Sequence, residues 1–210
     1  MIKILAHRGL WSQPEEKNSL EALSASFDLG VGIETDIRDC DGTLVVSHDP
    51  PCQDSALRLD TLLKAYTMRL TRPILALNIK SDGLQSSLQT ALQQYGIDEY
   101  FVFDMSVPDT LGYQRLQMPI AARISEYEPI NLLAEDAPWI WLDAFHSEWF
   151  DSSLIQDWID RGKRVAVVSP ELHRRPHLIL WERLKSLRDP SQVYLCTDLV
   201  KEAKEFFDEE

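Results

Sequence analysis

Two carboxylates and two histidines near the start of the chain have the types and spacing for metal-assisted acid–base chemistry. Glu34 and Asp36 are two residues apart in an apolar run that predicts a strand, so both side chains should point to one face. Carboxylates that face the same way repel each other unless a cation lies between them, and a hard divalent cation suits oxygen ligands. The alternative is the ordinary solvated face of an edge strand. His7 and His48 each follow a predicted strand, and paired imidazoles suit proton transfer near neutral pH. For each histidine the alternative is a structural hydrogen-bonding role.

Two cationic side chains lie close to these groups in the sequence pattern. Arg8 follows His7 directly, and its guanidinium can bind two anionic oxygens at once. Lys80 shares a strand face with Asn78 and follows the apolar run Ile74–Leu77. Surface ion pairs and solvent exposure are the alternatives for Arg8 and Lys80. Together the two residues predict a binding site for an anion.

Further polar side chains end the later predicted strands. On a barrel of parallel strands the carboxyl ends face the active site, so these residues are expected to shape a pocket. Trp11 either borders that pocket or anchors the first loop. Asp198 either lines the pocket or caps a helix. The predicted pocket residues are Asp104, Glu126 and Asp143, with Glu128, Glu171 and His173 as further candidates.

Short apolar runs alternate with segments of helical period, which predicts an α/β fold with a parallel sheet. Asn18, Asp54 or Asp60, and Asp151 or Ser152 are start signals for three of the helices, and Gly30, Gly96 and Gly162 are stop signals. Strands are expected at 2–6, 32–37, 44–47, 74–79, 100–103, 119–122, 139–142, 164–168 and 193–196, and helices at 19–29, 57–70, 84–95, 153–161, 177–187 and 199–207.

Eight main strands predict a small (β/α)8 TIM barrel that occupies residues 1–210 as a single domain, with 44–47 as an extra strand. Such barrels typically have about 250 residues, so 210 is at the small end. An open doubly wound sheet is the structural alternative. Trp139 and Trp141 flank an apolar strand and are expected in the core.

Composition limits the function classes. The net charge is 21 − 34 = −13, which argues against a broad nucleic-acid or anionic-membrane surface but leaves room for a small anionic ligand. No apolar run reaches the 18 residues or so that a membrane helix needs, and the apolar start is too short for a secretory signal. Cys40, Cys52 and Cys196 are odd in number and unpaired in spacing, so we expect no disulfide framework and a reduced, cytoplasmic setting.

Several motifs in residues 4–49 resemble the glycerophosphodiester phosphodiesterase family. Their order and spacing are specific, whereas beyond residue 80 the resemblance is looser, with Cys196-Thr197-Asp198 similar to the family's last strand end. The matching segments are His7-Arg8-Gly9, Asn18-Ser19-Leu20-Glu21-Ala22, Ile33-Glu34-Thr35-Asp36-Ile37-Arg38, Asp41-Gly42 and Val45-Val46-Ser47-His48-Asp49.

The resemblance implies a TIM barrel of the phospholipase-C-like phosphodiesterase type that hydrolyses a small phosphodiester with the help of a metal. It implies that His7 and His48 act as acid and base, and that Glu34 and Asp36 hold Mg²⁺ or Ca²⁺, with Mn²⁺ as a further option. Of the two histidines, His7 is expected to be the base. Arg8 and Lys80 would then bind the substrate phosphate. The resemblance also implies that the protein acts in lipid metabolism.

The sequence departs from the family at two places. Pro14 to Ser19 contains an insertion, and the third strand ends Asn78-Ile79-Lys80 where the family has a carboxylate ligand. Asn can coordinate through its carbonyl oxygen, but the site loses one negative charge. Asp104, Glu126 or a water are candidates to compensate. The substitution also supports an alternative, a catalytically silent barrel that binds a phosphorylated ligand or a partner. A third possibility is intramolecular transfer to a cyclic phosphate. The oligomeric state is not indicated by the sequence.

Overall fold

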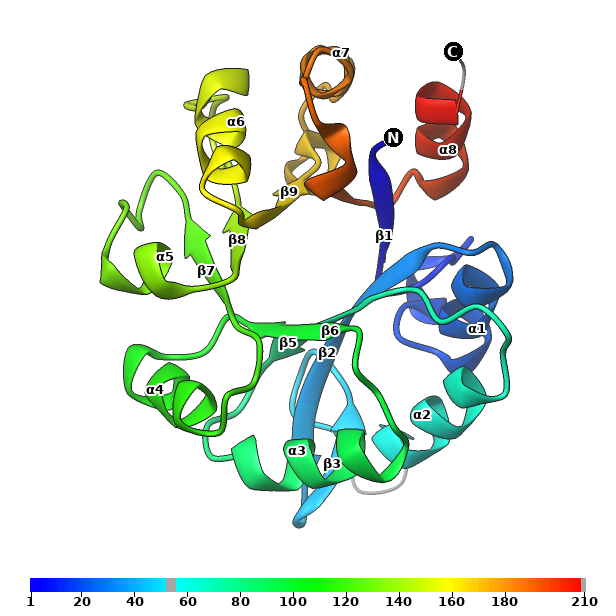
Figure 1. The fold of residues 1–210 in the computed structure, drawn as a ribbon. Coiled ribbons are helices and arrows are strands. Elements are labelled where there is room, and N and C mark those ends of the chain that lie inside the picture. The colour runs from blue at the N-terminus through cyan, green and yellow to red at the C-terminus, as the bar shows by residue number, and fades with distance from the viewer. Residues whose placement is uncertain (52–55, 209–210) are drawn as a thin grey trace. The chain divides into compact units, whose positions relative to one another are not determined.

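The computed structural model describes residues 1–51 and 56–208. Within them, ten strands and eight α-helices largely alternate, which confirms the predicted α/β class (Figure 1). The strands are β1 Lys3–His7, β2 Gly32–Cys40, β3 Thr43–Val46, β4 Leu57–Arg58, β5 Leu75–Ile79, β6 Tyr100–Phe103, β7 Ala121–Ile124, β8 Trp139–Leu142, β9 Arg164–Val168 and β10 Val193–Thr197. The helices are α1 Leu20–Asp28, α2 Leu59–Thr67, α3 Gln85–Gln94, α4 Val107–Arg115, α5 Leu132–Asp136, α6 Ser152–Asp160, α7 Leu178–Lys185 and α8 Val200–Asp208.

The chain forms two compact units, which are described separately. The N-terminal unit is Ala6–Ile120, and the C-terminal unit is Met1–Leu5 with Ala121–Glu210. Strand β1 contributes residues to both. The expectation of a single domain stays a prediction.

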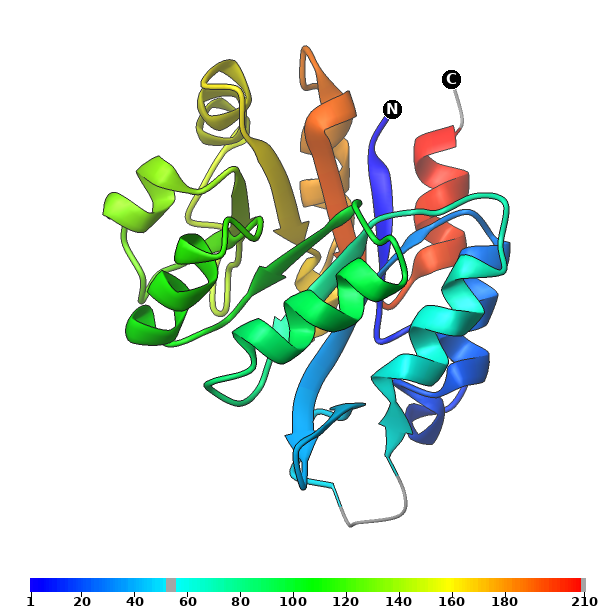
Figure 2. The ribbon, with the colours of Figure 1, turned by 60° about the horizontal axis from the view of Figure 1, so that its bottom comes forward.

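The sheet of the N-terminal unit places the middle of β2 beside the end of β5. These strands are parallel, with Asp36 opposite Asn78 in the register, and β6 pairs with β5 in the same direction. Strand β3 instead folds back antiparallel to β2, as Figure 2 shows. Because Asp36 and Asn78 are opposite each other in this register, the polar residues in the middle of β2 and at the end of β5 must lie close together.

The sheet of the C-terminal unit has β7, β8, β9 and β10 in parallel order. Its core contains the fully buried Trp158 and Trp181, from α6 and α7. Trp139 and Trp141 are also buried, which confirms their predicted place in the core. Helix α6 packs against β9, the strand that follows it.

The prediction that the second helix begins at Leu57 is wrong. Leu57 and Arg58 form β4, because they pair with Val46 and Val45 of β3, and α2 begins only at Leu59. Of the two expected start signals, Asp60 lies in the first turn of α2 and Asp54 lies outside the described residues. Pairing with β3, which lies more than ten residues earlier in the chain, therefore overrides the helical period at this point.

Helices α4 and α5 were not predicted. Helix α4 contains Pro108 near its start and Gly112 in its interior, and α5 has five residues. Such segments give a weak helical signal, because Gly has low helix propensity and five residues are too few for a period to show.

The other helix signals have mixed outcomes. Ser19 and not Asn18 caps α1, since the Ser19 hydroxyl accepts a hydrogen bond from the Ala22 N–H. Asp151 caps α6 as predicted, accepting from two backbone N–H groups. The predicted glycine stops are confirmed by their left-handed φ angles, which are 74° at Gly30, 59° at Gly96 and 79° at Gly162.

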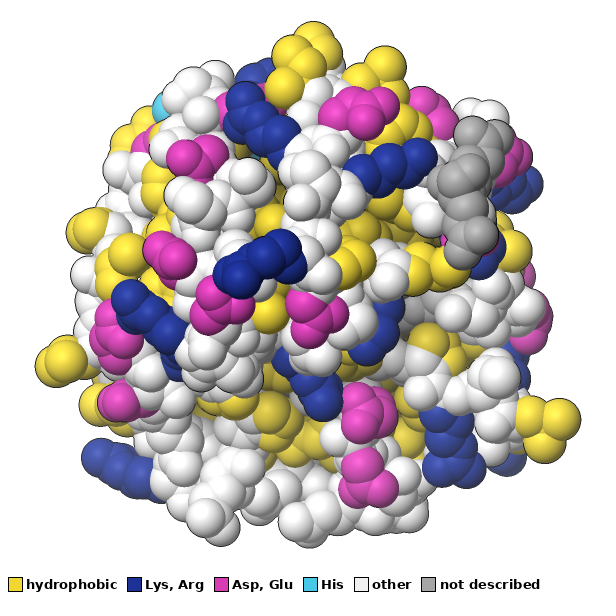
Figure 3. All heavy atoms as spheres, turned by 45° about the horizontal axis from the view of Figure 1, so that its top comes forward, with side chains coloured by type: hydrophobic (Ala, Val, Ile, Leu, Met, Phe, Trp, Pro, Cys, Tyr) yellow, Lys and Arg dark blue, Asp and Glu magenta, His cyan; other side chains and the backbone are white. Residues whose placement is uncertain are grey.

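Three further observations concern the charged surface, the cysteines and the length of the helices. On the face in Figure 3, acidic and basic side chains are interspersed among apolar ones. Cys40 and Cys196 are thiols and not halves of a disulfide, and Cys52 lies outside the described residues. None of the helices described is long and apolar enough to cross a membrane.

Candidate active site

The two carboxylates of β2 are buried beside the end of β5. Glu34 is 2% exposed and Asp36 is 0% exposed. Asn78 donates a hydrogen bond from Nδ2 to Glu34 Oε1 at 3.2 Å, and Lys80 Nζ lies 3.5 Å from Asp36 Oδ1. The parallel register of β2 and β5 thus brings four of the predicted site residues into one cluster. A solvated edge strand, the alternative for Glu34 and Asp36, is excluded by their burial.

The turn after β1 adds an imidazole and a guanidinium to this cluster. His7 Nε2 lies 3.9 Å from Glu34 Oε2, and Arg8 Nε lies 3.0 Å from Asp36 Oδ2. Gly9 has a φ of 95°, and a Cβ there would lie 2.7 Å from the Ala22 backbone carbon in α1. Only glycine fits so close to the helix, so the His7-Arg8-Gly9 motif is a tight turn that directs two side chains at the carboxylates.

The backbone at Ser47 and His48 is hydrogen-bonded to β2, the strand that carries Glu34 and Asp36. The Ser47 N–H donates to the Asp36 carbonyl at 3.0 Å, and Arg38 Nη2 donates to the His48 carbonyl at 2.9 Å. The His48 side chain is 45% exposed, and its Nδ1 lies 2.9 Å from Asp49 Oδ1. With Nδ1 engaged by a carboxylate, Nε2 is the ring nitrogen left for proton exchange.

Asn18 is a site residue that the sequence reasoning missed. Its Nδ2 donates to Asp36 Oδ2 at 2.8 Å, and its Oδ1 accepts from the Thr35 hydroxyl at 2.7 Å. Its backbone N–H donates to the Arg8 carbonyl at 2.9 Å, and its φ is 62°. The signal available in the sequence was Ser19 directly after Asn18, because a serine that caps the helix leaves the asparagine amide to bind other groups.

Asp104 completes a chain of alternating charges. Lys80 Nζ lies 3.5 Å from Asp104 Oδ2 as well as 3.5 Å from Asp36 Oδ1. The order is therefore Arg8, Asp36, Lys80, Asp104, in which each cation contacts a carboxylate. Asp104 also has a left-handed φ of 74°, which is uncommon outside glycine and is often found at functional sites.

The oxygens of this cluster fit a hard cation. Glu34 Oε2, Asp36 Oδ1 and Asn78 Oδ1 are buried and accept no hydrogen bond. Such acceptors are costly to leave unsatisfied, and two carboxylates with one amide oxygen form a suitable donor set for Mg²⁺ or Ca²⁺. Burial raises the pKa of Glu34, while the nearby His7 opposes that change. Among the described residues no three His, Cys, Asp or Glu side chains are grouped to hold a metal, and the third buried oxygen beside the two carboxylates belongs to the Asn78 amide.

Comparison with known proteins finds likeness only at the level of structure. No family model matches the chain, and no curated protein matches it. A protein of Galdieria sulphuraria assigned to the glycerophosphodiester phosphodiesterases is 17% identical, with a TM-score of 0.80 over 100% of this chain and 98% of that one. A glycerophosphodiester phosphodiesterase from Parabacteroides distasonis is 18% identical, with a TM-score of 0.71 and coverage of 99% and 97%. A phosphodiesterase from Oleispira antarctica, solved with the product sn-glycerol-3-phosphate, is 16% identical, with a TM-score of 0.72 and coverage of 100% and 98%.

The chain has the fold of the glycerophosphodiester phosphodiesterases. The predicted TIM-barrel class is therefore confirmed, and the open doubly wound alternative is wrong. The fold was predicted from the alternation of strands and helices, and the motifs that carried the resemblance coincide with the cluster in the N-terminal unit.

The predicted pocket residues of the C-terminal unit are engaged in local bonds. Glu126 accepts from the backbone N–H groups of Phe145, His146 and Ser147 at 3.0 to 3.2 Å. Burial alone would raise the pKa of Glu126, but the backbone N–H donors outweigh it and lower the pKa to about 2. Asp143 accepts from its neighbour's N–H at 2.8 Å. The other candidates are paired as Arg123 with Glu128, His173 with Asp143, and Thr197 with Glu171.

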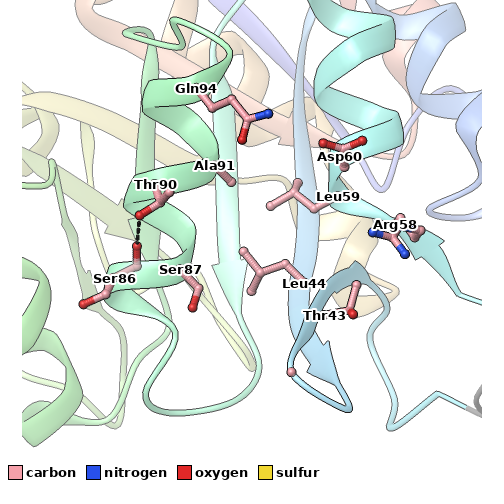
Figure 4. Close-up of a pocket in the computed structure, with 11 residues that line it drawn as sticks. Thr43, Leu44, Arg58, Leu59, Asp60, Ser86, Ser87, Thr90, Ala91 and Gln94 are labelled. Atoms are coloured by element: carbon pink, nitrogen blue, oxygen red, sulfur yellow. Dashed lines mark hydrogen bonds between the residues drawn. The ribbon is translucent and has the colours of Figure 1, made fainter.

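Two further features of the N-terminal unit lie outside the cluster. Trp11 donates from Nε1 to the His7 carbonyl at 3.1 Å, which supports its role as a loop anchor. A cavity of about 460 Å³ opens among β3, the start of α2 and one face of α3, with Leu44 and Leu59 on one side and Ser86, Ser87 and Thr90 on the other (Figure 4). None of the predicted site residues lines this cavity.

Proposed function

We propose that the protein is a divergent glycerophosphodiester phosphodiesterase that hydrolyses a small phosphodiester to an alcohol and a phosphomonoester. The observation that carries the proposal is the cluster of His7, Arg8, Glu34, Asp36 and Lys80, with buried oxygens that lack donors, in a chain of this fold. The Oleispira antarctica phosphodiesterase of the same fold binds sn-glycerol-3-phosphate as its product, which supports a glycerophosphodiester substrate.

Glu34, Asp36 and the Asn78 amide oxygen are the residues that would hold a divalent metal. Mg²⁺ and Ca²⁺ fit these oxygen donors best, and Mn²⁺ is a further candidate. When bound, such a metal polarises the phosphoryl group and stabilises the charge that develops on it.

Arg8 and Lys80 bind the substrate phosphate in this proposal. Both cations contact Asp36 in the absence of substrate. A phosphate that enters beside Asp36 offers them further anionic oxygens, and the Arg8 guanidinium can bind two such oxygens at once. The two side chains orient the diester and neutralise its charge.

The two histidines exchange protons with the reacting oxygens. His7 takes the proton from the nucleophile, and Glu34 beside Nε2 stabilises the imidazolium that forms. His48 donates a proton from Nε2 to the leaving alcohol, while Asp49 at Nδ1 orients the ring. The nucleophile is a water for hydrolysis, whereas a neighbouring substrate hydroxyl would give a cyclic phosphate.

A second candidate function is a silent barrel that binds a phosphorylated ligand. Two observations favour it: position 78 carries a neutral amide, and Asp36 already contacts two cations. Retention of both histidines opposes it, because a binding module has no need for an acid and a base.

Turnover of a panel of phosphodiesters separates these functions. The panel runs from glycerophosphodiesters to an aryl diester, after chelation and with Mg²⁺, Mn²⁺ or Ca²⁺ added back. Metal-dependent release of an alcohol, with a phosphomonoester in the phosphorus NMR spectrum, is the expected result. A cyclic phosphate would assign intramolecular transfer, and no turnover with any diester would favour the silent barrel.

A further inference from the structure

The side chains around the proposed metal site carry little net charge without Asp104. Glu34 and Asp36 contribute two negative charges, and Arg8 and Lys80 contribute two positive charges that both face Asp36. Asn78 is neutral. A divalent cation binds weakly to a site whose carboxylates are already neutralised, because its attraction to the acids is offset by repulsion from the two cations.

Asp104 directly follows β6, the strand that pairs with β5, and it contacts Lys80, one of the two cations that weaken the site. Phe103 is opposite Asn78 in the register of β5 and β6, so Asp104 follows directly beyond it. The Lys80 ammonium lies 3.5 Å from Asp104 Oδ2 and 3.5 Å from Asp36 Oδ1. The Asp104 side chain is 17% exposed, so this attraction is only partly screened by water.

The backbone at Asp104 supports a role beyond that of an ordinary surface acid. Its φ of 74° is a left-handed conformation, which costs energy for most residues and least for Asn, Asp and Gly. This conformation places a short acidic side chain against Lys80, at the edge of the cluster. A strained position that carries a charge beside a functional group is typical of active sites.

We propose that Asp104 supplies the negative charge that a carboxylate at position 78 would otherwise bring. It is a positioning residue that shares the Lys80 ammonium, so that Asp36 keeps its affinity for a divalent cation. With Asp104 the cluster has three carboxylates against two cations. This inference rests on the proposed function, because it assumes that Glu34, Asp36 and Asn78 hold a metal.

The test is the affinity of the full chain for Mn²⁺, followed by electron paramagnetic resonance. Four proteins are compared: the unchanged chain, Asp104→Asn, Asn78→Asp, and the double variant. Asn tolerates the left-handed backbone, so Asp104→Asn removes the charge and keeps the turn. We expect Asp104→Asn to weaken Mn²⁺ binding by roughly tenfold, since one charge near the ion is lost. Asn78→Asp in that background should restore most of the affinity.

Asp98→Asn is the matched control, because Asp98 is exposed and precedes the opposite end of β6. It should leave Mn²⁺ affinity unchanged. If the unchanged chain binds no Mn²⁺, both the proposed function and this inference are overturned. If it binds Mn²⁺ and Asp104→Asn binds equally well, only the inference is overturned. Binding of Mn²⁺ that Asp104→Asn weakens and Asn78→Asp does not restore would also overturn the inference. If Asp104 replaces a carboxylate at position 78, a carboxylate at either position should support binding.

Discussion

Both units have acidic side chains on, or shortly after, strands of their parallel sheets, but the two sets have opposite environments. In the N-terminal unit Glu34 and Asp36 are buried, and each keeps one oxygen that accepts no hydrogen bond. In the C-terminal unit both oxygens of Glu126 accept from backbone N–H groups. Carboxylates therefore keep acceptor oxygens for a ligand in one unit, whereas in the other they bind the backbone of their own loop.

The difference separates candidate catalytic groups from structural ones. The oxygens of a carboxylate that accepts hydrogen bonds from its own loop are already occupied. A buried carboxylate oxygen that accepts no hydrogen bond can still bind a ligand. Glu171 is an intermediate case, since one of its oxygens accepts from Thr197 and the other has no hydrogen-bond partner. Burial combined with unsatisfied oxygens, more than position alone, identifies the site.

The largest effect is expected from removing either histidine of the N-terminal unit. His7→Ala and His48→Ala should each lower kcat by about 10² to 10⁴, because an acid or base is lost. His146→Ala is the matched change in the C-terminal unit, where the ring contacts Tyr127, and it should retain turnover. Steady-state kinetics on proteins with equal circular dichroism spectra measures this. Near-normal turnover in His7→Ala or His48→Ala would contradict the assignment.

A smaller effect is expected at Asn18, which orients Asp36. Asn18→Ala removes the donor to Asp36 Oδ2 and should weaken Mn²⁺ binding by about 10- to 100-fold, as is typical of residues that orient a ligand. Asn131→Ala is the counterpart in the C-terminal unit, where Asn131 caps α5. It should lower stability by about 1 kcal/mol and leave Mn²⁺ affinity unchanged. Equal losses of Mn²⁺ affinity in both variants would contradict the comparison.

Glu126 should affect stability and not turnover. Its pKa is lowered from 4.5 to about 2 in the folded chain, so its stabilising effect is complete above about pH 5 and is lost as the pH falls toward 2. Glu126→Gln should remove this part of the acid dependence and lower stability at neutral pH by about 1 kcal/mol. Urea unfolding of both proteins at several pH values measures this. An unchanged acid dependence, or a large loss of turnover at full folding, would contradict the structural role.

The smallest effect is expected in the cavity of Figure 4. Thr90 lines it, and the Thr90 hydroxyl donates to the Ser86 carbonyl within α3. Thr90→Val removes that bond at an exposed helix position and should change stability by about 0.5 kcal/mol or less, with unchanged kcat and KM. A large rise in KM would mean that substrate reaches this cavity.

The fold was predictable from the sequence because most strands and helices have a signal in their own residues. The runs 100–103, 139–142 and 164–168 coincide with β6, β8 and β9. The predictions that failed concern elements that are short, or that form only by pairing with another strand. Helices α4 and α5 have little period, and β4 is defined by its pairs on β3 rather than by its own residues.

The site was predictable only in part, since residue type and spacing do not reveal side-chain partners. Glu34, Asp36, Asn78 and Lys80 come together as the two-residue spacing indicated. Asn18 resembled a helix cap in sequence, although its amide binds Thr35 and Asp36. Glu126 and Asp143 resembled Asp104 as strand-end acids, and only their hydrogen bonds distinguish them.

The most direct test of the central claim is the initial rate of glycerophosphodiester cleavage by the chelated chain as Mg²⁺ is added back, measured beside Glu34→Gln. The account predicts that cleavage rises with Mg²⁺ in the unchanged chain and stays near background in Glu34→Gln. Cleavage that is equal in both proteins would contradict a catalytic role for the buried carboxylates of the N-terminal unit.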